Sequence, residues 1–184
     1  MGTIDFFRTS LKNIKTVGTI TRSSKYLCKD MISHVDFTQA KSIVEMGAGD
    51  GVITKHILKA MRPDAELLTF EILPKMFKQL SAIDDKRMHA VEDSVEKIGE
   101  YLAQYEMGQA DCIISAIPFV AFPEKLTYKI LHECKTHLKP GGKFIQVHYS
   151  LLTKKIYKEV FGNVDVNFTP FNVPPAFVLV SENV

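Results

Sequence analysis

The chain contains no tryptophan, only three cysteines, and no apolar run long enough to cross a bilayer. Cys28, Cys112 and Cys134 are odd in number and show no CxxC spacing, which argues against a disulfide framework or a structural zinc site and fits a reducing cytoplasm. The longest apolar stretch, residues 112–122, is interrupted by a serine and a proline, whereas a membrane-spanning helix needs about 20 apolar residues. We therefore expect no transmembrane segment.

The overall composition favours one folded domain. With 184 residues, 46% hydrophobic and 24% charged, the chain can bury a sizeable core and is too apolar for general disorder. The N-terminus has basic residues but no continuous apolar core and no small-residue cleavage site, so we expect no secretory signal.

Positive charge is concentrated at the N-terminus. The chain has a net charge of +2, yet residues 1–30 hold six basic and two acidic side chains, so the remainder is slightly acidic. We expect an anionic partner, such as a phosphate, a lipid surface or a nucleic acid, to be met by this segment.

From residue 41 onward, β-rich runs alternate with helical patterns. The predicted strands are 41–46, 66–71, 88–93, 110–117, 142–150, 165–169 and 176–181, and the predicted helices are 51–61, 73–81, 94–104, 123–138 and 151–161. The first four strands are mostly apolar on both faces, as in a parallel sheet covered by helices. The last two lie too close for a crossover helix, so we expect them to be antiparallel. Residues 41–184 are thus predicted to form an α/β, doubly wound Rossmann-like domain with a mostly parallel seven-stranded sheet and an antiparallel last strand.

Residues 1–40 precede this domain as amphipathic helices. Ile4, Phe7, Leu11 and Ile14 recur at helical spacing beside three cations, and a second helix is predicted over 23–35 with Ser23 or Ser24 as its cap. Two interpretations are compatible if the helix detaches: a lid packed on the core, or a helix lying flat on an anionic membrane.

The strongest motif follows the first predicted strand, as Glu45-Met46-Gly47-Ala48-Gly49-Asp50-Gly51. Glycines at alternate positions allow a sharp turn and a close approach of a ligand to the backbone. The dinucleotide fingerprint GxGxxG is not matched, because Val52 occupies its third glycine position. The pattern resembles the first motif of class I S-adenosylmethionine-dependent methyltransferases; the alternative is a merely tight strand–helix turn. The resemblance implies that Glu45, Gly47, Ala48, Gly49 and Gly51 bind the cofactor S-adenosyl-L-methionine.

Two further acids follow the next two strands. Glu71, with Ile72 beside it, ends the second strand, where an acid can bind both ribose hydroxyls of a nucleoside. Asp93-Ser94 ends the third strand, where the methyltransferase resemblance implies an acceptor for the adenine amino group. Asp93 is equally suited to be the N-cap of the next helix, and the sequence leaves both roles open.

The fourth strand ends in Ser115-Ala116-Ile117-Pro118-Phe119. This segment resembles the N-P-P-Y or N-L-P-Y acceptor site of class I amino-methyltransferases, with serine in place of asparagine. The resemblance implies that Ser115, Pro118 and Phe119 frame the acceptor amine, and Ser115 also adjoins the cofactor. The alternative is a buried strand end followed by a proline turn. Tyr149, after His148, either contacts the substrate from the fifth strand or simply caps that strand.

Several stretches resemble bacterial phospholipid N-methyltransferases more specifically. They are Phe6-Phe7, residues 13–18 with Ser23-Ser24, residues 146–149, and the run Asn172-Val173-Pro174-Pro175-Ala176-Phe177-Val178. The chain departs from the family by having Ala48 and Asp50 in the glycine loop where the family has proline and threonine, and by having no Gly-Pro after Tyr149. The rRNA adenine dimethyltransferases share the first motif and are close competitors.

The resemblance implies an N-methyltransferase acting on phosphatidylethanolamine or a related amino-phospholipid, with Arg22 or Lys25 holding the phosphate. It also implies a cytoplasmic enzyme that contacts the inner membrane face through residues 1–30. No metal site is expected, and no side chain is obvious as the base. A nucleic-acid substrate is disfavoured because residues 31–184 carry a net charge of −2. The alternatives are an rRNA adenine or small-molecule amine methyltransferase, or a non-catalytic cofactor-binding protein at a lipid surface.

Overall fold

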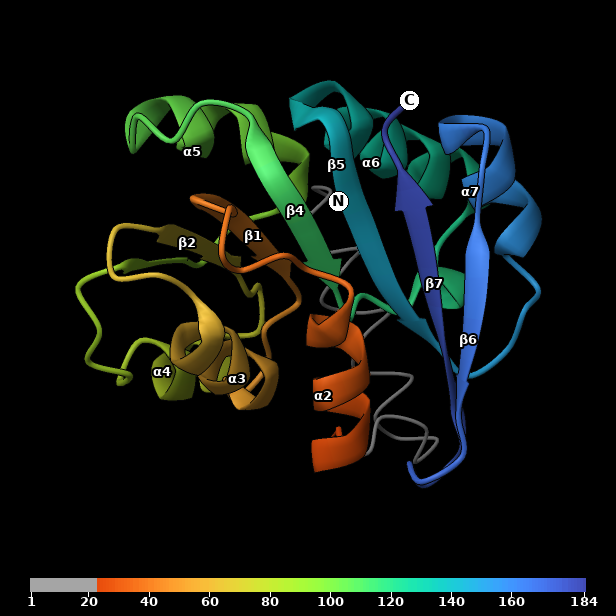
Figure 1. Ribbon diagram of the computed structural model, residues 1–184, viewed down its shortest axis with the longest axis horizontal. Helices are drawn as coiled ribbons and strands as arrows, with labels where there is room; N and C mark the ends of the chain where they lie inside the picture. The colour runs from red at the N-terminus through yellow and green to blue at the C-terminus, as the bar shows by residue number, and fades with distance from the viewer. Residues whose placement is uncertain (1–22) are drawn as a thin grey trace.

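The sheet at the centre of the molecule has seven strands in the order β3-β2-β1-β4-β5-β7-β6 (Figure 1). The computed structural model describes residues 23–184, so the predicted helix over Ile4–Ile14 and the predicted contact from Arg22 lie outside the described residues. The strands are β1 (Ser42–Met46), β2 (Glu66–Phe70), β3 (Met88–Val91), β4 (Ala110–Ser115), β5 (Leu138–His148), β6 (Asp165–Thr169) and β7 (Ala176–Glu182). Only β7 runs antiparallel to its neighbours β5 and β6. The predicted fold class is confirmed.

Helices fill the connections between the strands. They are α2 (Lys25–Ser33), α3 (Val52–Ala60), α4 (Pro74–Leu80), α5 (Ile98–Gln104), α6 (Glu124–His137) and α7 (Lys154–Phe161), with short 3₁₀ turns η1 (Val95–Lys97) and η2 (Phe119–Ala121). Ser24 is the N-cap of α2, and its hydroxyl accepts a hydrogen bond from the Leu27 N–H at 3.2 Å. None of the helices described is long and apolar enough to span a bilayer.

Alternate side chains of the buried strands enter two separate cores. Val44, Met46 and Ile113 face α5, α6 and α7, whereas their neighbours Ile43 and Ile114 face α2 and α3. Period-two alternation with apolar residues on both faces is the pattern of a sheet covered by helices on both sides.

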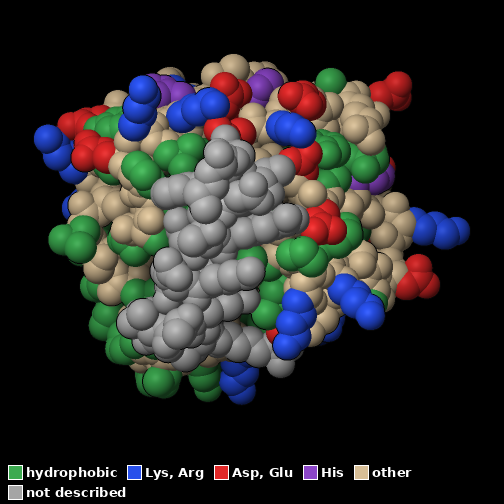
Figure 2. Space-filling view, turned by 180° about the vertical axis from the view of Figure 1, so that it is seen from behind, with side chains coloured by type: hydrophobic (Ala, Val, Ile, Leu, Met, Phe, Trp, Pro, Cys, Tyr) green, Lys and Arg blue, Asp and Glu red, His purple; other side chains and the backbone are tan. Residues whose placement is uncertain are grey.

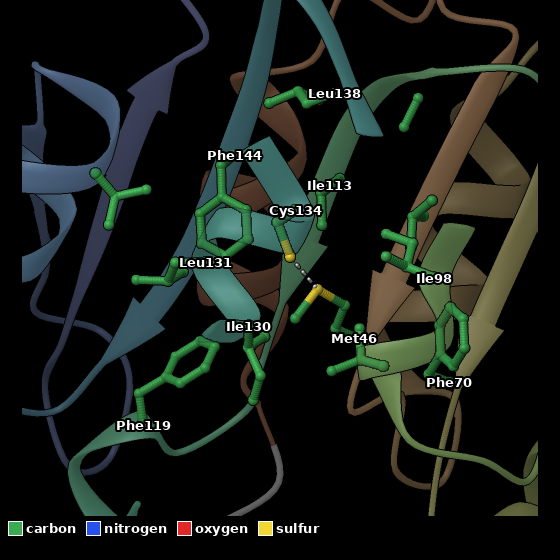
Figure 3. Packing of buried hydrophobic residues seen from close by; sticks show 14 of the residues in the cluster. Met46, Phe70, Ile98, Ile113, Phe119, Ile130, Leu131, Cys134, Leu138 and Phe144 are labelled. Carbon is green, nitrogen blue, oxygen red and sulfur yellow. Dashed lines mark hydrogen bonds between the residues drawn. The ribbon is translucent and has the colours of Figure 1, made fainter. Parts of the chain in front are cut away.

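Figure 3 shows the first of these cores. Cys134 of α6 lies over Met46 of β1, with 3.5 Å between the two sulfur atoms. Cys28, Cys112 and Cys134 are all buried free thiols, and burial raises the pKa of Cys112 and of Cys134. These thiols therefore behave as small apolar side chains.

The fifth strand begins earlier than the sequence predicts. The helix α6 ends at His137, as expected before the Lys-Pro-Gly-Gly segment, but β5 already pairs with β4 at Leu138 opposite Ala110. The next pair is Lys143 with Cys112, so residues 139–142 bulge out of the ladder. Gly141 accommodates the bulge with a φ of +75°. The prediction of a strand starting at Gly142 was therefore too short.

Because β1, β2, β3 and β4 are parallel, their carboxyl ends meet at one edge of the sheet, the lower edge in Figure 1. The glycine loop, Glu71, Asp93 and the segment after Ser115 all follow these strand ends. The sheet thus brings together four motifs that are up to 70 residues apart in the sequence.

Candidate cofactor and acceptor site

A cleft of about 300 Å³ opens at this carboxyl edge. Its walls come from the loops after the first four strands, from the start of α3 and α4, and from Ser23, which precedes the N-cap of α2. The described lining residues are Ser23, Gly47, Ala48, Gly49, Asp50, Val52, Ile53, Phe70, Glu71, Ile72, Leu73, Met76, Asp93, Ser94, Val95, Ala116, Ile117, Pro118 and Phe122.

The glycines of the first motif serve two different purposes. Gly49 lines the cleft with a φ of +59°, and a Cβ there would meet no atom within 4 Å, so its backbone is open to a ligand. Gly51 has a φ of +81° and is the N-cap of α3, and a Cβ there would lie 2.6 Å from Ile83 Cδ1. Gly51 is absent from the described lining, so it shapes the start of the helix rather than the wall of the cleft.

Glu71 joins two walls of the cleft. One carboxylate oxygen accepts the Gly49 N–H at 2.8 Å, and the other accepts the Leu73 N–H at 2.8 Å. Only 5% of the residue is exposed, and it lines the cleft. Each carboxylate oxygen has a second lone pair, so the group can also accept from a hydroxyl donor in the cleft.

Asp93 is held in its charged form by three donors. Burial alone would raise its pKa, but the Lys97 ammonium at 2.9 Å, the Ser94 N–H and the Tyr101 hydroxyl outweigh burial and lower the pKa below its ordinary value. The N-cap of η1 is Ser94, whose hydroxyl accepts from the Glu96 N–H. Asp93 is thus a carboxylate in the wall of the cleft and is not the cap.

Glu45 lies beneath the glycine loop, and its protonation state differs from that of Asp93. The residue is 1% exposed, and burial raises its pKa to about 8, although the Thr54 hydroxyl donates to it at 2.6 Å. The charge of Glu71 raises this pKa further. The other oxygen of Glu45 has no hydrogen-bond partner among the described residues. Near pH 7 this side chain is predominantly neutral, and it does not line the described cleft.

The loop after β4 is fixed by internal hydrogen bonds. Ser115 is fully buried, and its hydroxyl accepts the Ile117 N–H at 3.3 Å. Gln146 of β5 donates to the Ile117 carbonyl at 2.9 Å. The cleft is therefore lined by Ala116, Ile117 and Pro118 rather than by Ser115, which supports the turn from below.

The aromatic residue that the loop after β4 contributes to the cleft is not the one predicted from the sequence. Phe119 is 1% exposed and lies among the core residues drawn in Figure 3. Its ring packs edge-on against the rings of Phe122 and Tyr157. Phe122, three residues later, lines the cleft with Pro118. The reason is the single 3₁₀ turn η2, which begins with Phe119 in the core and has Phe122 as its C-cap. Phe119 therefore does not line the cleft, whereas Phe122 does.

The remaining predicted contacts lie away from the described walls. Tyr149 is half-buried against the core that faces α2 and α3. His148 is buried, shares a hydrogen bond with the Tyr157 hydroxyl at 2.7 Å, and has its pKa lowered to about 4 by burial. Lys25 is exposed, with its ammonium 5.2 Å from the centre of the Tyr26 ring.

Several lining residues escaped sequence analysis. Phe70, Val52 and Met76 lie inside predicted elements and Phe122 lies just before one, so their apolar side chains ordinarily signal core packing. The signal that could have found them is position, because each either ends a strand that faces the cleft or follows such a strand end by six or seven residues. Among residues 23–184 there is no cluster of His, Cys, Asp and Glu suited to a metal ion.

Residues 10–170 match the sequence model of the Methyltransferase small domain family. The chain belongs to this family. Together with the seven-stranded fold, family membership makes the protein a class I S-adenosylmethionine-dependent methyltransferase. The cleft fits the cofactor, because it combines an open glycine backbone at Gly49 with carboxylates at two successive strand ends, Glu71 and Asp93.

Individual methyltransferases resemble the chain over nearly its full length. The ornithine lipid N-methyltransferase of Singulisphaera acidiphila is 29% identical over 168 residues, which are 90% of this chain and 88% of the relative. The magnesium protoporphyrin IX methyltransferase of Synechocystis PCC 6803, solved with S-adenosylmethionine bound, aligns with a TM-score of 0.64, 11% identity and coverage of 100% and 86% of the two chains. The precorrin-6y C5,15-methyltransferase of Geobacter metallireducens GS-15 aligns with a TM-score of 0.67, 13% identity and coverage of 89% and 90%. The two structures show the shared fold.

Proposed function

We propose that this methyltransferase transfers a methyl group to the amine of a membrane amino-lipid, such as phosphatidylethanolamine or an ornithine lipid. The observation that carries the proposal is the near full-length similarity to an ornithine lipid N-methyltransferase. The charge of the cleft supports it, because Asp50, Glu71 and Asp93 are the ionisable side chains of its described lining, and none of that lining is Lys, Arg or His. Such a wall suits a cationic cofactor and a basic acceptor better than an acidic acceptor.

In this proposal, different strand ends bind the cofactor and the acceptor. Glu71, Asp93 and the backbone of Gly47 to Gly49 hold S-adenosylmethionine, which supplies a methyl group made electrophilic by its sulfonium. Pro118 and Phe122 shape the acceptor side, and Ser115 and Gln146 keep that turn in place from below. Holding the reacting groups in line and excluding water supply the rate enhancement. The amine attacks as the neutral form, after its proton has passed to water.

The lipid would reach the cleft from a bilayer surface. Residues 1–30 carry a net charge of +4, and each cation near an anionic surface contributes about 1 kcal/mol. Lys25 is exposed and lies two residues from Ser23, which lines the cleft, and in this proposal its ammonium binds the lipid phosphate outside the described walls. Replacing Lys12 and Lys15 by Glu should weaken co-sedimentation with anionic vesicles while leaving S-adenosylhomocysteine binding unchanged. If co-sedimentation is unchanged, the cations of residues 1–30 do not contribute to membrane binding.

The acceptor is tested with purified protein and radiolabelled S-adenosylmethionine. Vesicles that contain phosphatidylethanolamine, vesicles that contain an ornithine lipid, and total RNA are supplied in parallel reactions. We expect label in the lipid fraction, and the relative rates on the two lipids identify the preferred head group. Label confined to RNA would instead assign the protein to the nucleic-acid methyltransferases.

A further inference from the structure

The turn between β6 and β7 is an apolar tip at the same edge as the cleft. In residues 170–175, the sequence Pro-Phe-Asn-Val-Pro-Pro exposes every residue except Asn172, which is 1% exposed. Phe171 is 72% exposed and Val173 is 81% exposed. Tyr26 of α2, 49% exposed, lies against Phe171 with 5.5 Å between the ring centres. We call Tyr26 with residues 170, 171 and 173–175 the apolar tip.

Buried Asn172 holds this tip in shape. Its side-chain oxygen accepts the Ser24 N–H at 3.0 Å, and its side-chain amide donates to the Pro174 carbonyl at 2.7 Å. Because Asn172 is turned inward, its neighbours Phe171 and Val173 project outward on either side. The bond to Ser24 also fixes the tip to the wall of the cleft, since Ser23 lines that cleft. The motif containing Asn172 thus builds a protruding surface beside the opening.

Lys25 is the one charged residue in the two segments that form the tip. Residues 23–26 and 169–176 contain no acid, and the Asp30 carboxylate of α2 accepts a hydrogen bond from the Thr169 hydroxyl at the base of the tip. In the space-filling view of Figure 2, hydrophobic side chains gather at the lower left, on the side of the β6–β7 turn, and no acidic side chain is visible there. Exposed aromatic and aliphatic side chains with a flanking cation match the interface of an anionic bilayer.

We propose that the apolar tip inserts into the surface of an anionic bilayer and sets the opening of the cleft against the lipid head groups. The inference rests on the proposed function, which requires a bilayer-bound substrate. A second copy of the chain suits the tip less well, because a stable protein interface engages about 20–30 residues a side and the tip offers six. Insertion of a few apolar side chains into a bilayer needs no such area.

The test compares the full chain with the double variant Phe171→Ser and Val173→Ser. The matched control is Val184→Ser, which replaces an equally exposed apolar residue, 81% exposed, near the opposite edge of the sheet (Figure 1). Binding is measured by co-sedimentation with vesicles of phosphatidylglycerol and phosphatidylcholine. We expect the double variant to bind at least about tenfold more weakly, because it loses two inserted side chains. The control should bind as the parent does, and all three proteins should bind S-adenosylhomocysteine equally.

The outcomes separate this inference from the proposed function. If the double variant co-sediments as the parent does, the tip is not a bilayer contact, whatever lipid the enzyme methylates. If the parent is a dimer that the double variant converts to a monomer, the tip is an interface between copies and the inference is overturned. If the parent methylates no lipid but the double variant still loses vesicle binding, the result supports the apolar tip as a bilayer contact and contradicts the proposed lipid substrate.

Discussion

Two of the three carboxyl groups near the cleft, those of Asp93 and Glu45, differ in charge because their surroundings differ. Asp93 is charged since Lys97, Tyr101 and a backbone N–H donate to it, whereas Glu45 has one hydroxyl donor and no cation to offset its burial. Glu71 lies between the loops and accepts a backbone N–H on each oxygen. The carboxyl groups of Glu71 and Asp93 therefore line the cleft at two strand ends, whereas Glu45 is a neutral buried acid beneath the glycine loop.

Glu71 gives the sharpest test of cofactor binding at the residue scale. Replacing Glu71 by Ala should weaken S-adenosylhomocysteine binding by about 1.5–3 kcal/mol, the range for hydrogen bonds to a charged group. The control is Glu66→Ala, at the exposed opposite end of the same strand β2. Titration calorimetry that finds equal affinity in a folded Glu71 variant would exclude this residue from the site.

Glu45 predicts a pH dependence of stability. Its pKa is about 8 in the folded protein against an ordinary 4.5, so between these values the unfolded chain loses a proton that the folded chain keeps. The free energy of unfolding therefore falls as the pH rises through this window. Glu45→Gln removes the titration, so its stability relative to the parent should rise by about 1.4 kcal/mol per pH unit between pH 5 and pH 8. Urea unfolding at several pH values measures this, and parallel curves would contradict it.

At the scale of elements, the loop after β4 separates the ring of Phe119, which is buried in the core, from the ring of Phe122, which lines the cleft. Phe119→Ala should cost about 3–5 kcal/mol of stability because the ring is fully packed, as in other large-to-small core substitutions.

Phe122→Ala should lower kcat on the lipid while leaving S-adenosylhomocysteine affinity nearly intact, since it removes acceptor positioning. Thermal unfolding and steady-state kinetics on both variants check this. A Phe122 variant with normal kcat would place the acceptor elsewhere.

The elements also show what the sequence could and could not predict. The mostly parallel seven-stranded sheet and the meeting of Glu71 and Asp93 at one edge follow from apolar runs and parallel connections, which are local signals. The strand order was not predicted from the sequence. The ring that faces the cleft depends on one 3₁₀ turn, and the early start of β5 depends on a bulge at residues 139–142. Neither geometry is encoded by hydrophobic periodicity. Asn172 stood within a family-like motif, but its role became visible only through its contact with Ser24, 148 residues away.

At the scale of the whole molecule, one edge of the sheet carries those features of the proposed function that lie within residues 23–184. The cleft, the apolar tip and Lys25 all lie at the carboxyl ends of the parallel strands, whereas the C-terminus lies near the other edge (Figure 1). A bilayer held against the tip would face the cleft directly. The molecule therefore has the one-sided arrangement expected of an enzyme that binds a water-soluble cofactor and a membrane-bound acceptor in the same opening.

The most direct test of this account is the lipid content of bacterial cells that produce the protein, measured by mass spectrometry of total lipid extracts. The account predicts N-methylated amino-lipids in cells with the parent protein and their loss in cells with the folded Glu71→Ala variant. An unchanged lipid profile in cells that contain the parent protein, shown to bind S-adenosylhomocysteine after purification, would contradict it.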